Sequence, residues 1–305
     1  MERLKSITNL LLGAKIPLRS IEDVPPLHRR PGILKGYRPV PLSKSLCAVS
    51  TFRVHNETGN IWTHLIGFAI LAALGVSQLS QVKSTSQVDF LALLVYYVGS
   101  CFCMILSSFY HMGNCHSEAA RDLLLNLDVF GICMNLIASY LPGLVFGFYC
   151  KSWTSGIYVG IVCSSVLSAF TLPCLLHGST CDQHNESCSK GKKEDKTLKA
   201  IHNTRTILLL GSVVFCIVPI IHWLLVAGPE EVAMFFPKLS LMLILYASGF
   251  FFYVTNFPES YFPGKFDIWG SSHQFWHVIV LLAGIVWAYA LPELLHFKLN
   301  ASCPA

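Results

Sequence analysis

Charged residues are scarce in this chain. Only 13% of its 305 residues are charged, whereas 53% are hydrophobic, and the mean hydropathy is +0.54. A soluble domain of this length carries about 25% charged residues on average. The shortage excludes a soluble globular protein and indicates an integral membrane protein.

Two further features are missing. Residues 1–17 lack an apolar run long enough for the core of a signal peptide, so we expect no cleaved signal. The spacing of Leu4, Ile7, Leu11 and Leu12 suits an amphipathic helix lying on a membrane, and a disordered basic tail is an equal alternative. The twelve cysteines show no repeated Cys-x-x-Cys spacing, which favours small buried hydrophobic residues over a disulfide scaffold.

Long apolar stretches are what the sequence does contain. A helix that crosses the hydrocarbon needs about 20 apolar residues. Seven stretches qualify, at residues 60–80, 89–110, 126–148, 156–177, 206–227, 239–256 and 272–295. Pro142 in the third and Pro219 in the fifth predict kinks or local unwinding.

The predicted organisation follows from these stretches. We expect an all-α membrane domain of seven transmembrane helices over residues 56–296. Residues 1–55 precede it as a tail, and residues 297–305 follow it as a shorter one. The polar stretch 178–203 is predicted to be a mobile connector.

The distribution of positive charge orients the chain. All but four of its 22 lysines and arginines fall on the side of the amino terminus, the exceptions being Lys83, Lys151, Lys238 and Lys298. Positive charge stays on the cytosolic side during membrane insertion. We therefore predict a cytosolic amino terminus and an outside or lumenal carboxyl terminus.

Titratable residues are nearly absent from the spans, and a charge at membrane depth is costly and usually functional. The exceptions are His64, His111, Asp128, His222, His273 and His277. All but His222 fall at helix ends that the predicted orientation places in the cytosol. We interpret His222 as a packed, hydrogen-bonded histidine.

Three of these histidines suggest a metal site. His273 and His277 are four residues apart, so on a helix their rings project from one face and can share an ion. The pair alone is weak evidence, because histidines are common at membrane interfaces. His111 adds a third imidazole from another helix at the same depth, and three histidines with an open fourth position are typical of catalytic zinc.

Two further residues are candidates for catalysis. Asp128 could deprotonate a metal-activated water, or it could cap the third helix or pair with Arg121. Ser107 lies one turn before His111 and could hydrogen-bond that water or a substrate carbonyl. From its spacing alone, Ser107 is a serine of helix packing.

A polar layer lies at the start of the first span. Glu57, Asn60 and His64 recur there at helical spacing. We favour capping of exposed amides by Glu57 and Asn60, with His64 packed beneath them. The alternative is an outer polar layer that supports the metal site.

Several separated motifs carry a family resemblance. They are NETGNIWTH at residues 56–64, SSFYH at 107–111, CHSE at 115–118, LD at 127–128, and FPGKFDIW at 262–269 followed by SHQFWH at 272–277. In this order they resemble the progestin and adipoQ receptor family, which includes the adiponectin receptors. The resemblance runs from about Gly36 to Tyr289.

The resemblance implies a function for the candidate residues. It implies zinc on His111, His273 and His277, with Asp128 holding the water on the metal and Ser107 beside it. The wider superfamily includes alkaline ceramidases. By that analogy, a ceramide-like lipid would enter sideways from the bilayer and be cleaved to a fatty acid and a sphingoid base.

Different segments of the chain resemble different members of the family. The short tail and the run 270–274 resemble a Golgi-resident member that tethers Raf-type kinases, whereas residues 52–64 and 264–269 resemble an adiponectin receptor. We therefore expect either the Golgi membrane or the plasma membrane.

Three hypotheses follow. The chain is a zinc-dependent, ceramidase-like hydrolase, or a receptor in which zinc clamps helices together, or an anchor whose proline-bearing tail holds cytosolic signalling proteins. The charge bias opposes a rhodopsin-type receptor.

Overall fold

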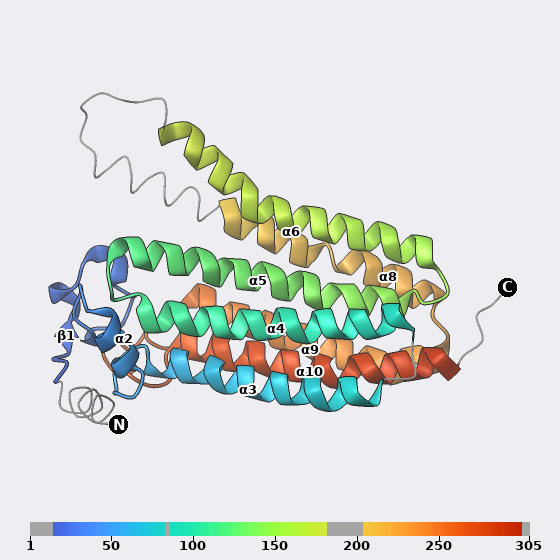
Figure 1. Cartoon of the computed structure of the whole chain (residues 1–305), viewed down its shortest axis with the longest axis horizontal. Coiled ribbons are helices and arrows are strands. Elements are labelled where there is room, and N and C mark those ends of the chain that lie inside the picture. The colour runs from blue at the N-terminus through green and yellow to red at the C-terminus, as the bar shows by residue number, and fades with distance from the viewer. Residues whose placement is uncertain (1–14, 83–85, 182–203, 301–305) are drawn as a thin grey trace, which may run out of the picture. The chain divides into compact units, whose positions relative to one another are not determined.

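The structure is a computed structural model that describes residues 15–82, 86–181 and 204–300 (Figure 1). Seven helices in these ranges are long and apolar enough to cross a membrane, as the sequence predicts. They are α3 (Thr58–Gln81), α4 (Gln87–Gly113), α5 (Glu118–Gly147), α6 (Ser152–Cys181), the span Thr204–Val226 that ends in α8 (Ile217–Val226), α9 (Pro229–Thr255) and α10 (Ser272–Asn300).

The chain forms two compact units. Of the described residues, the first unit contains 15–77, 100–131 and 237–289, and the second contains 78–82, 86–99, 132–181, 204–236 and 290–300. All the candidate site residues except His222 belong to the first unit.

Two helices begin far before their apolar stretches. α5 begins at Glu118, where the Ser117 hydroxyl accepts a hydrogen bond from the Ala120 amide, so Arg121 lies in this helix and not in a loop. α9 begins at Pro229 and has Glu230 and Glu231 in its first turn. Proline and acidic residues stabilise a helix start, although they interrupt the apolar pattern that we used to place the spans.

The predicted unwinding of the fifth span is confirmed. The helix gives way to a turn at residues 215–216, four positions before Pro219. Proline has no amide hydrogen to donate to Phe215, and the Val218 amide donates to the Phe215 carbonyl instead, at 3.0 Å. α5, in contrast, stays helical across Pro142.

Close helix packing builds the core of the first unit. Leu71, Met104, Val280 and Leu281 form a buried cluster from α3, α4 and α10. A Cβ atom on Gly67 would lie 3.0 Å from the Met104 sulfur, so glycine is what allows α3 to approach this closely. Small residues at helix contacts are typical of membrane proteins, since packing replaces the hydrophobic driving force.

The segment before the first span is folded from residue 15 onward. Its elements are β1 (Arg19–Ser20), η1 (Ile21–Asp23), η2 (Pro26–His28), β2 (Lys35–Tyr37) and α2 (Lys44–Ser50), with β1 and β2 paired antiparallel. The predicted amphipathic helix in residues 1–14 and most of the connector at 178–203 lie outside the described residues.

Arg38 fastens this segment to the end of α4. Its guanidinium is buried and donates to the carbonyl oxygens of His111 (2.6 Å) and Met112 (2.8 Å). The same group donates to Ser50 Oγ and Asn114 Oδ1. The last carbonyls of a helix have no intrahelical donor, so Arg38 caps α4 beside His111.

Two polar side chains of the second unit, Glu231 and His222, have hydrogen-bond partners. Glu231 accepts hydrogen bonds from Trp223 Nε1 (2.7 Å) and from Lys298 Nζ (2.6 Å). His222 Nδ1 lies 2.9 Å from the Tyr158 hydroxyl, which confirms its interpretation as a packed, hydrogen-bonded residue.

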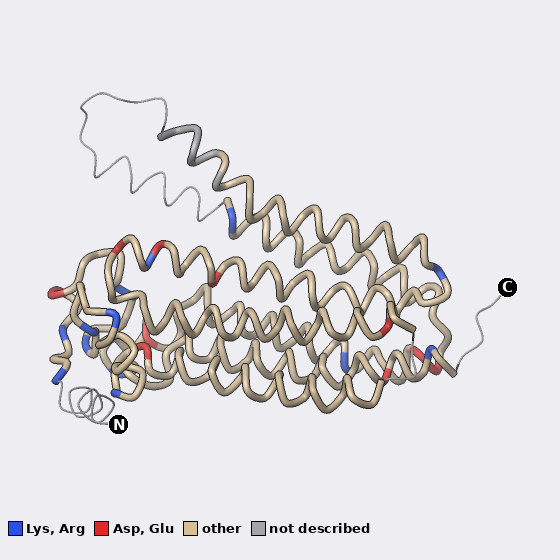
Figure 2. The backbone as a smooth tube through the Cα atoms, in the orientation of Figure 1, with Lys and Arg blue, Asp and Glu red and all other residues tan. Residues whose placement is uncertain are grey.

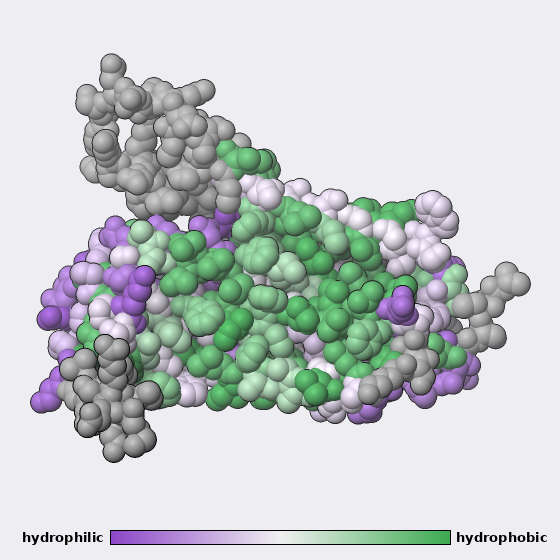
Figure 3. Space-filling view, viewed as in Figure 1, coloured by the Kyte–Doolittle hydropathy of each residue, from purple (hydrophilic) through white to green (hydrophobic). Residues whose placement is uncertain are grey.

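Charge and hydropathy follow the membrane pattern. In each unit charged residues gather toward the helix ends and are sparse along the helix middles (Figure 2). The visible surface over the helices is hydrophobic, and hydrophilic residues cover the β1, β2 and α2 region (Figure 3). This distribution is what a bilayer around the helices requires.

Candidate metal centre

The three predicted ligands converge. His111 lies near the end of α4, and His273 and His277 lie in the first turns of α10. One ring nitrogen from each forms a set within 4.8 Å of one another. His111 and His277 are buried, and His273 is partly buried. This group could hold a metal ion.

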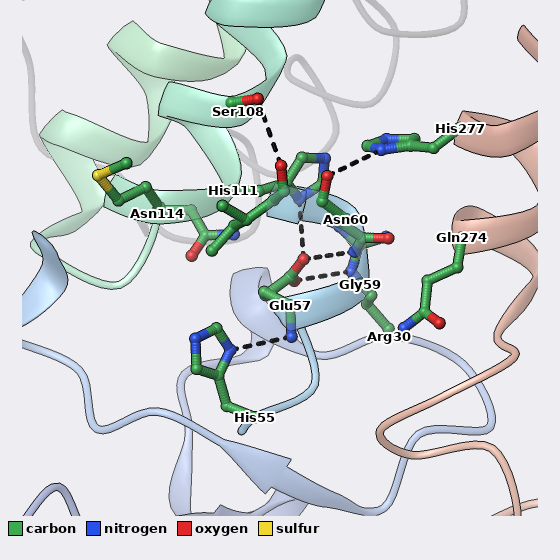
Figure 4. Close-up of polar contacts among 12 residues, drawn as sticks. Arg30, His55, Glu57, Gly59, Asn60, Ser108, His111, Asn114, Gln274 and His277 are labelled. Carbon is green, nitrogen blue, oxygen red and sulfur yellow. Dashed lines mark hydrogen bonds and ion pairs between the residues drawn. The ribbon is translucent and has the colours of Figure 1, made fainter. Parts of the chain in front are cut away.

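Glu57 orients the ring of His111. Its Oε2 lies 2.8 Å from Nδ1 of His111 (Figure 4). The other ring nitrogen, Nε2, is buried and has no partner among the described residues. A carboxylate on one nitrogen fixes the tautomer and leaves the lone pair of the other nitrogen available to a metal. The donor set and this unpartnered nitrogen fit a zinc ion.

His277 is oriented in a similar way from α3. Its Nδ1 lies 3.1 Å from the backbone oxygen of Asn60 and 3.3 Å from the Thr63 hydroxyl. The ring of His64 stacks on it with centroids 3.6 Å apart and planes 10° apart. The backbone contact holds Nδ1, which leaves Nε2 for a ligand role.

Glu57 belongs to a buried charge network. Its Oε1 accepts from Arg30 Nε at 3.2 Å, and its Oε2 accepts from Asn60 Nδ2 at 2.6 Å. Burial raises the pKa of the Glu57 carboxyl, but the charge of Arg30 and the hydrogen bonds from His111 and Asn60 outweigh it, so the pKa lies well below its ordinary value. Glu57 is therefore an anion beside the histidine cluster.

This network decides between the two predicted roles of the polar layer. The Glu57 carboxylate binds Arg30, Asn60 and His111, so the preference for a capping role was wrong and the supporting role is correct. The sequence did show the spacing of Glu57 and Asn60. It gave no sign that Arg30, from the tail, would reach them.

The start of α10 is also capped by a distant residue. The Glu259 carboxylate is buried and accepts from the Ser272 amide at 2.7 Å and from the Ser272 hydroxyl. A carboxylate at a helix amino terminus satisfies free amides and interacts favourably with the helix dipole. Glu259 thereby fixes the first turn of the helix that carries His273 and His277.

Asp128 and Ser107 lie beside the cluster. Asp128 is partly buried, forms a side-chain hydrogen bond with Ser107 and interacts electrostatically with His111. Both structural alternatives for Asp128 fail, because α5 begins ten residues earlier, at Glu118, and Arg121 pairs with Asp122 at 2.8 Å. The position of Asp128 is compatible with a catalytic carboxylate.

Comparisons with known proteins agree with this architecture. The pattern of the family described as Haemolysin-III related matches residues 52–288. Progestin and adipoQ receptor family member 3 of Mus musculus is 29% identical over 303 residues, covering 97% of this chain and 91% of that protein. The Adiponectin receptor protein of Drosophila melanogaster is 31% identical, covering 92% of this chain and 59% of that protein.

A third relative is Progestin and adipoQ receptor-like protein 1 of Caenorhabditis elegans. It is 31% identical, covering 88% of this chain and 58% of that protein. The family predicted from the motifs is therefore confirmed, and seven apolar helices agree with it. The chain belongs to the Haemolysin-III related family as a multi-pass membrane protein of the progestin and adipoQ receptor type.

Proposed function

We propose that this receptor-type protein holds a zinc ion on His111, His273 and His277 and hydrolyses an amide bond of a ceramide-like membrane lipid. The observation that carries the proposal is the buried Nε2 of His111, which faces no described partner although Glu57 fixes the other ring nitrogen. A zinc ion at such a site supplies Lewis-acid polarisation of a carbonyl and makes water more acidic.

Asp128 is the proposed general base. It accepts a proton from the attacking water as the water oxygen bonds to the amide carbon. When the carbon–nitrogen bond breaks, Asp128 returns that proton to the departing amine, which yields a fatty acid and a sphingoid base. Its hydrogen bond with Ser107 orients the carboxylate for both transfers.

A structural role of the metal is the second candidate. His111 lies on α4 and His273 and His277 lie on α10, so an ion shared among them would tie these helices together. In that case the ligands matter for stability, whereas Asp128 has little influence.

Metal content and turnover together separate the two functions. Purified wild type is compared with His273→Ala and Asp128→Asn by metal mass spectrometry, thermal unfolding and hydrolysis of ceramide. We expect about one zinc per chain in wild type, loss of zinc in His273→Ala, and retained zinc without turnover in Asp128→Asn. Zinc without turnover in wild type would leave only the structural role.

We also propose that the amino terminus faces the cytosol. Cys150, in the turn after α5, is disulfide-bonded, whereas Cys47 and Cys115 are free thiols although their sulfurs lie 3.5 Å apart. Disulfides persist in oxidising compartments and thiols in the cytosol. Cys115 precedes α5 and Cys150 follows it, so a membrane-crossing α5 places them on opposite sides.

Tag accessibility tests this orientation. An epitope tag at the amino terminus should be reached by antibody once the plasma membrane alone is permeabilised, with organelle membranes still sealed, and should not be reached in intact cells. Labelling of that tag in intact cells, or only after organelle membranes are also permeabilised, would overturn it.

A further inference from the structure

A cavity lies in the first unit, and its lining shares no residue with the histidine cluster. Its volume is about 610 Å³, and its walls come from residues 18–20, 35–36, 264–265 and 267–269. The β1–β2 pair supplies one wall, and the connection between α9 and α10 supplies the other. Binding pockets for small molecules are commonly about 300–1,000 Å³. The size suits a ligand larger than a single water or ion.

The charge of the cavity is positive. Arg19, Lys35 and Lys265 line it, and Asp267 is the one acidic residue among its lining residues. The Asp267 carboxylate is already engaged, because Oδ1 accepts from the Leu34 amide at 2.7 Å and Oδ2 from the Lys35 amide at 3.1 Å. It therefore serves to hold β2 against the opposite wall, and three cations against one carboxylate leave the lining with a net positive charge that attracts an anion.

Another acidic residue lies close by but is also engaged. Asp23 interacts electrostatically with Arg19. Its Oδ2 accepts from the Ser20 hydroxyl at 2.8 Å and from the Ser20 amide at 3.3 Å. Asp23 is tied to the turn after β1 and is absent from the cavity lining, so it offsets part of the charge of Arg19 and leaves Lys35 and Lys265 to attract an anion.

Two glycines shape the walls. Gly36 and Gly264 line the cavity with φ values of +87° and +81°, a backbone region that other residues rarely adopt. A Cβ atom on Gly36 would lie 2.5 Å from the Ile268 side chain. The Gly264 amide donates to the Gly32 carbonyl at 3.0 Å, so the two walls are joined by backbone contacts.

The rim of the cavity is apolar and exposed. Leu18 and Trp269 line it and are 46% and 58% exposed. Tyr261 and Phe262, just before the same wall, are 70% and 47% exposed. Tryptophan and tyrosine are enriched where a membrane meets water, with their rings at headgroup level. A rim of this kind suits a ligand that remains in the bilayer.

We propose that this cavity binds the phosphorylated headgroup of an anionic membrane lipid of the phosphoinositide type. The cations contact the phosphates, and the exposed rim inserts beside the acyl chains. Six spans separate the two walls along the chain, so both face the same membrane surface. The site shares no residue with the histidine cluster and does not depend on the proposed hydrolysis.

Short-chain lipids test the proposal on the purified full chain in detergent. Binding of dioctanoyl phosphatidylinositol bisphosphate and dioctanoyl phosphatidylcholine is measured by native mass spectrometry and thermal shift. Wild type should prefer the phosphoinositide. Lys35→Ala with Lys265→Ala should weaken its binding about 25-fold, on the basis of roughly fivefold per basic side chain near an anionic membrane surface.

The matched control removes two other lysines from the same unit. Lys15 and Lys44 are exposed and do not line the cavity, so Lys15→Ala with Lys44→Ala should bind as wild type does. Equal loss in both double variants, or no preference of wild type for the phosphoinositide, would overturn the site. Equally tight binding of soluble inositol trisphosphate would overturn its assignment to a lipid.

Discussion

Replacing Glu57 with glutamine removes the charge that orients His111 while it keeps the size of the side chain. In wild type, the Glu57 carboxylate accepts hydrogen bonds from His111 Nδ1 at 2.8 Å, from Asn60 at 2.6 Å and from Arg30 at 3.2 Å. Loss of such an outer partner typically costs roughly tenfold to hundredfold in metal affinity. That range corresponds to about 1.4–2.7 kcal/mol of binding free energy.

The assay is competition for zinc between the purified protein and a chromophoric chelator. The zinc affinity of Glu57→Gln should be roughly tenfold to hundredfold lower than that of wild type. Its elution volume should equal that of wild type. Glu118→Gln is the matched control, because it removes an exposed carboxylate at the start of α5. Its zinc affinity should equal that of wild type.

A second variant isolates the contact with His111. Arg30→Gln removes the ion pair with Glu57 but leaves the carboxylate on His111, so it should lower zinc affinity less than Glu57→Gln does. The reasoning is refuted if well-folded Glu57→Gln binds zinc as tightly as wild type, or if Arg30→Gln has the larger effect.

Three further predictions concern the segment before α3. Arg38→Ala leaves buried carbonyls of α4 without a donor and should lower the free energy of unfolding by about 3 kcal/mol. Thermal unfolding measures the loss, with Lys44→Ala as the control. Burial, aided by the charge of Arg38, lowers the pKa of His55 to about 3. An unfolded histidine binds a proton below about pH 6.5, so the free energy of unfolding of wild type should fall by about 1.4 kcal/mol per pH unit below that value. The free energy of unfolding of His55→Gln should depend less steeply on pH. A mild thiol oxidant should join Cys47 to Cys115 by removing two hydrogens, which peptide mass spectrometry detects and Cys115→Ser abolishes.

The seven helices could be predicted because they depend on composition. A bilayer demands about 20 apolar residues per span whatever the neighbouring helices do. The histidine cluster could be predicted for a local reason too, since His273 and His277 share one helical face and His111 ends another span at the same depth. The helix starts were predicted less accurately, because polar first turns such as that of α9 do not resemble the apolar sequence of a membrane span.

The contacts that support the cluster could not be predicted in this way. Glu57 stands three residues before Asn60, a spacing that equally suits capping of a helix start. Its actual partners, Arg30 and His111, are 27 and 54 residues distant in the sequence. Nothing in the composition of one segment specifies a hydrogen bond over such a separation, so only the folded structure reveals it.

These contacts change how the anchor hypothesis can be tested. If the tail only held cytosolic signalling proteins, its removal would leave the metal centre intact. In the structure, Arg30 binds Glu57 beside His111, and Arg38 caps the helix that carries His111. Deleting the tail would therefore disturb the metal centre and any partner site together. Substitution of the exposed Pro41 keeps Arg30 and Arg38 in place, so only partner binding should change and the two roles can be separated.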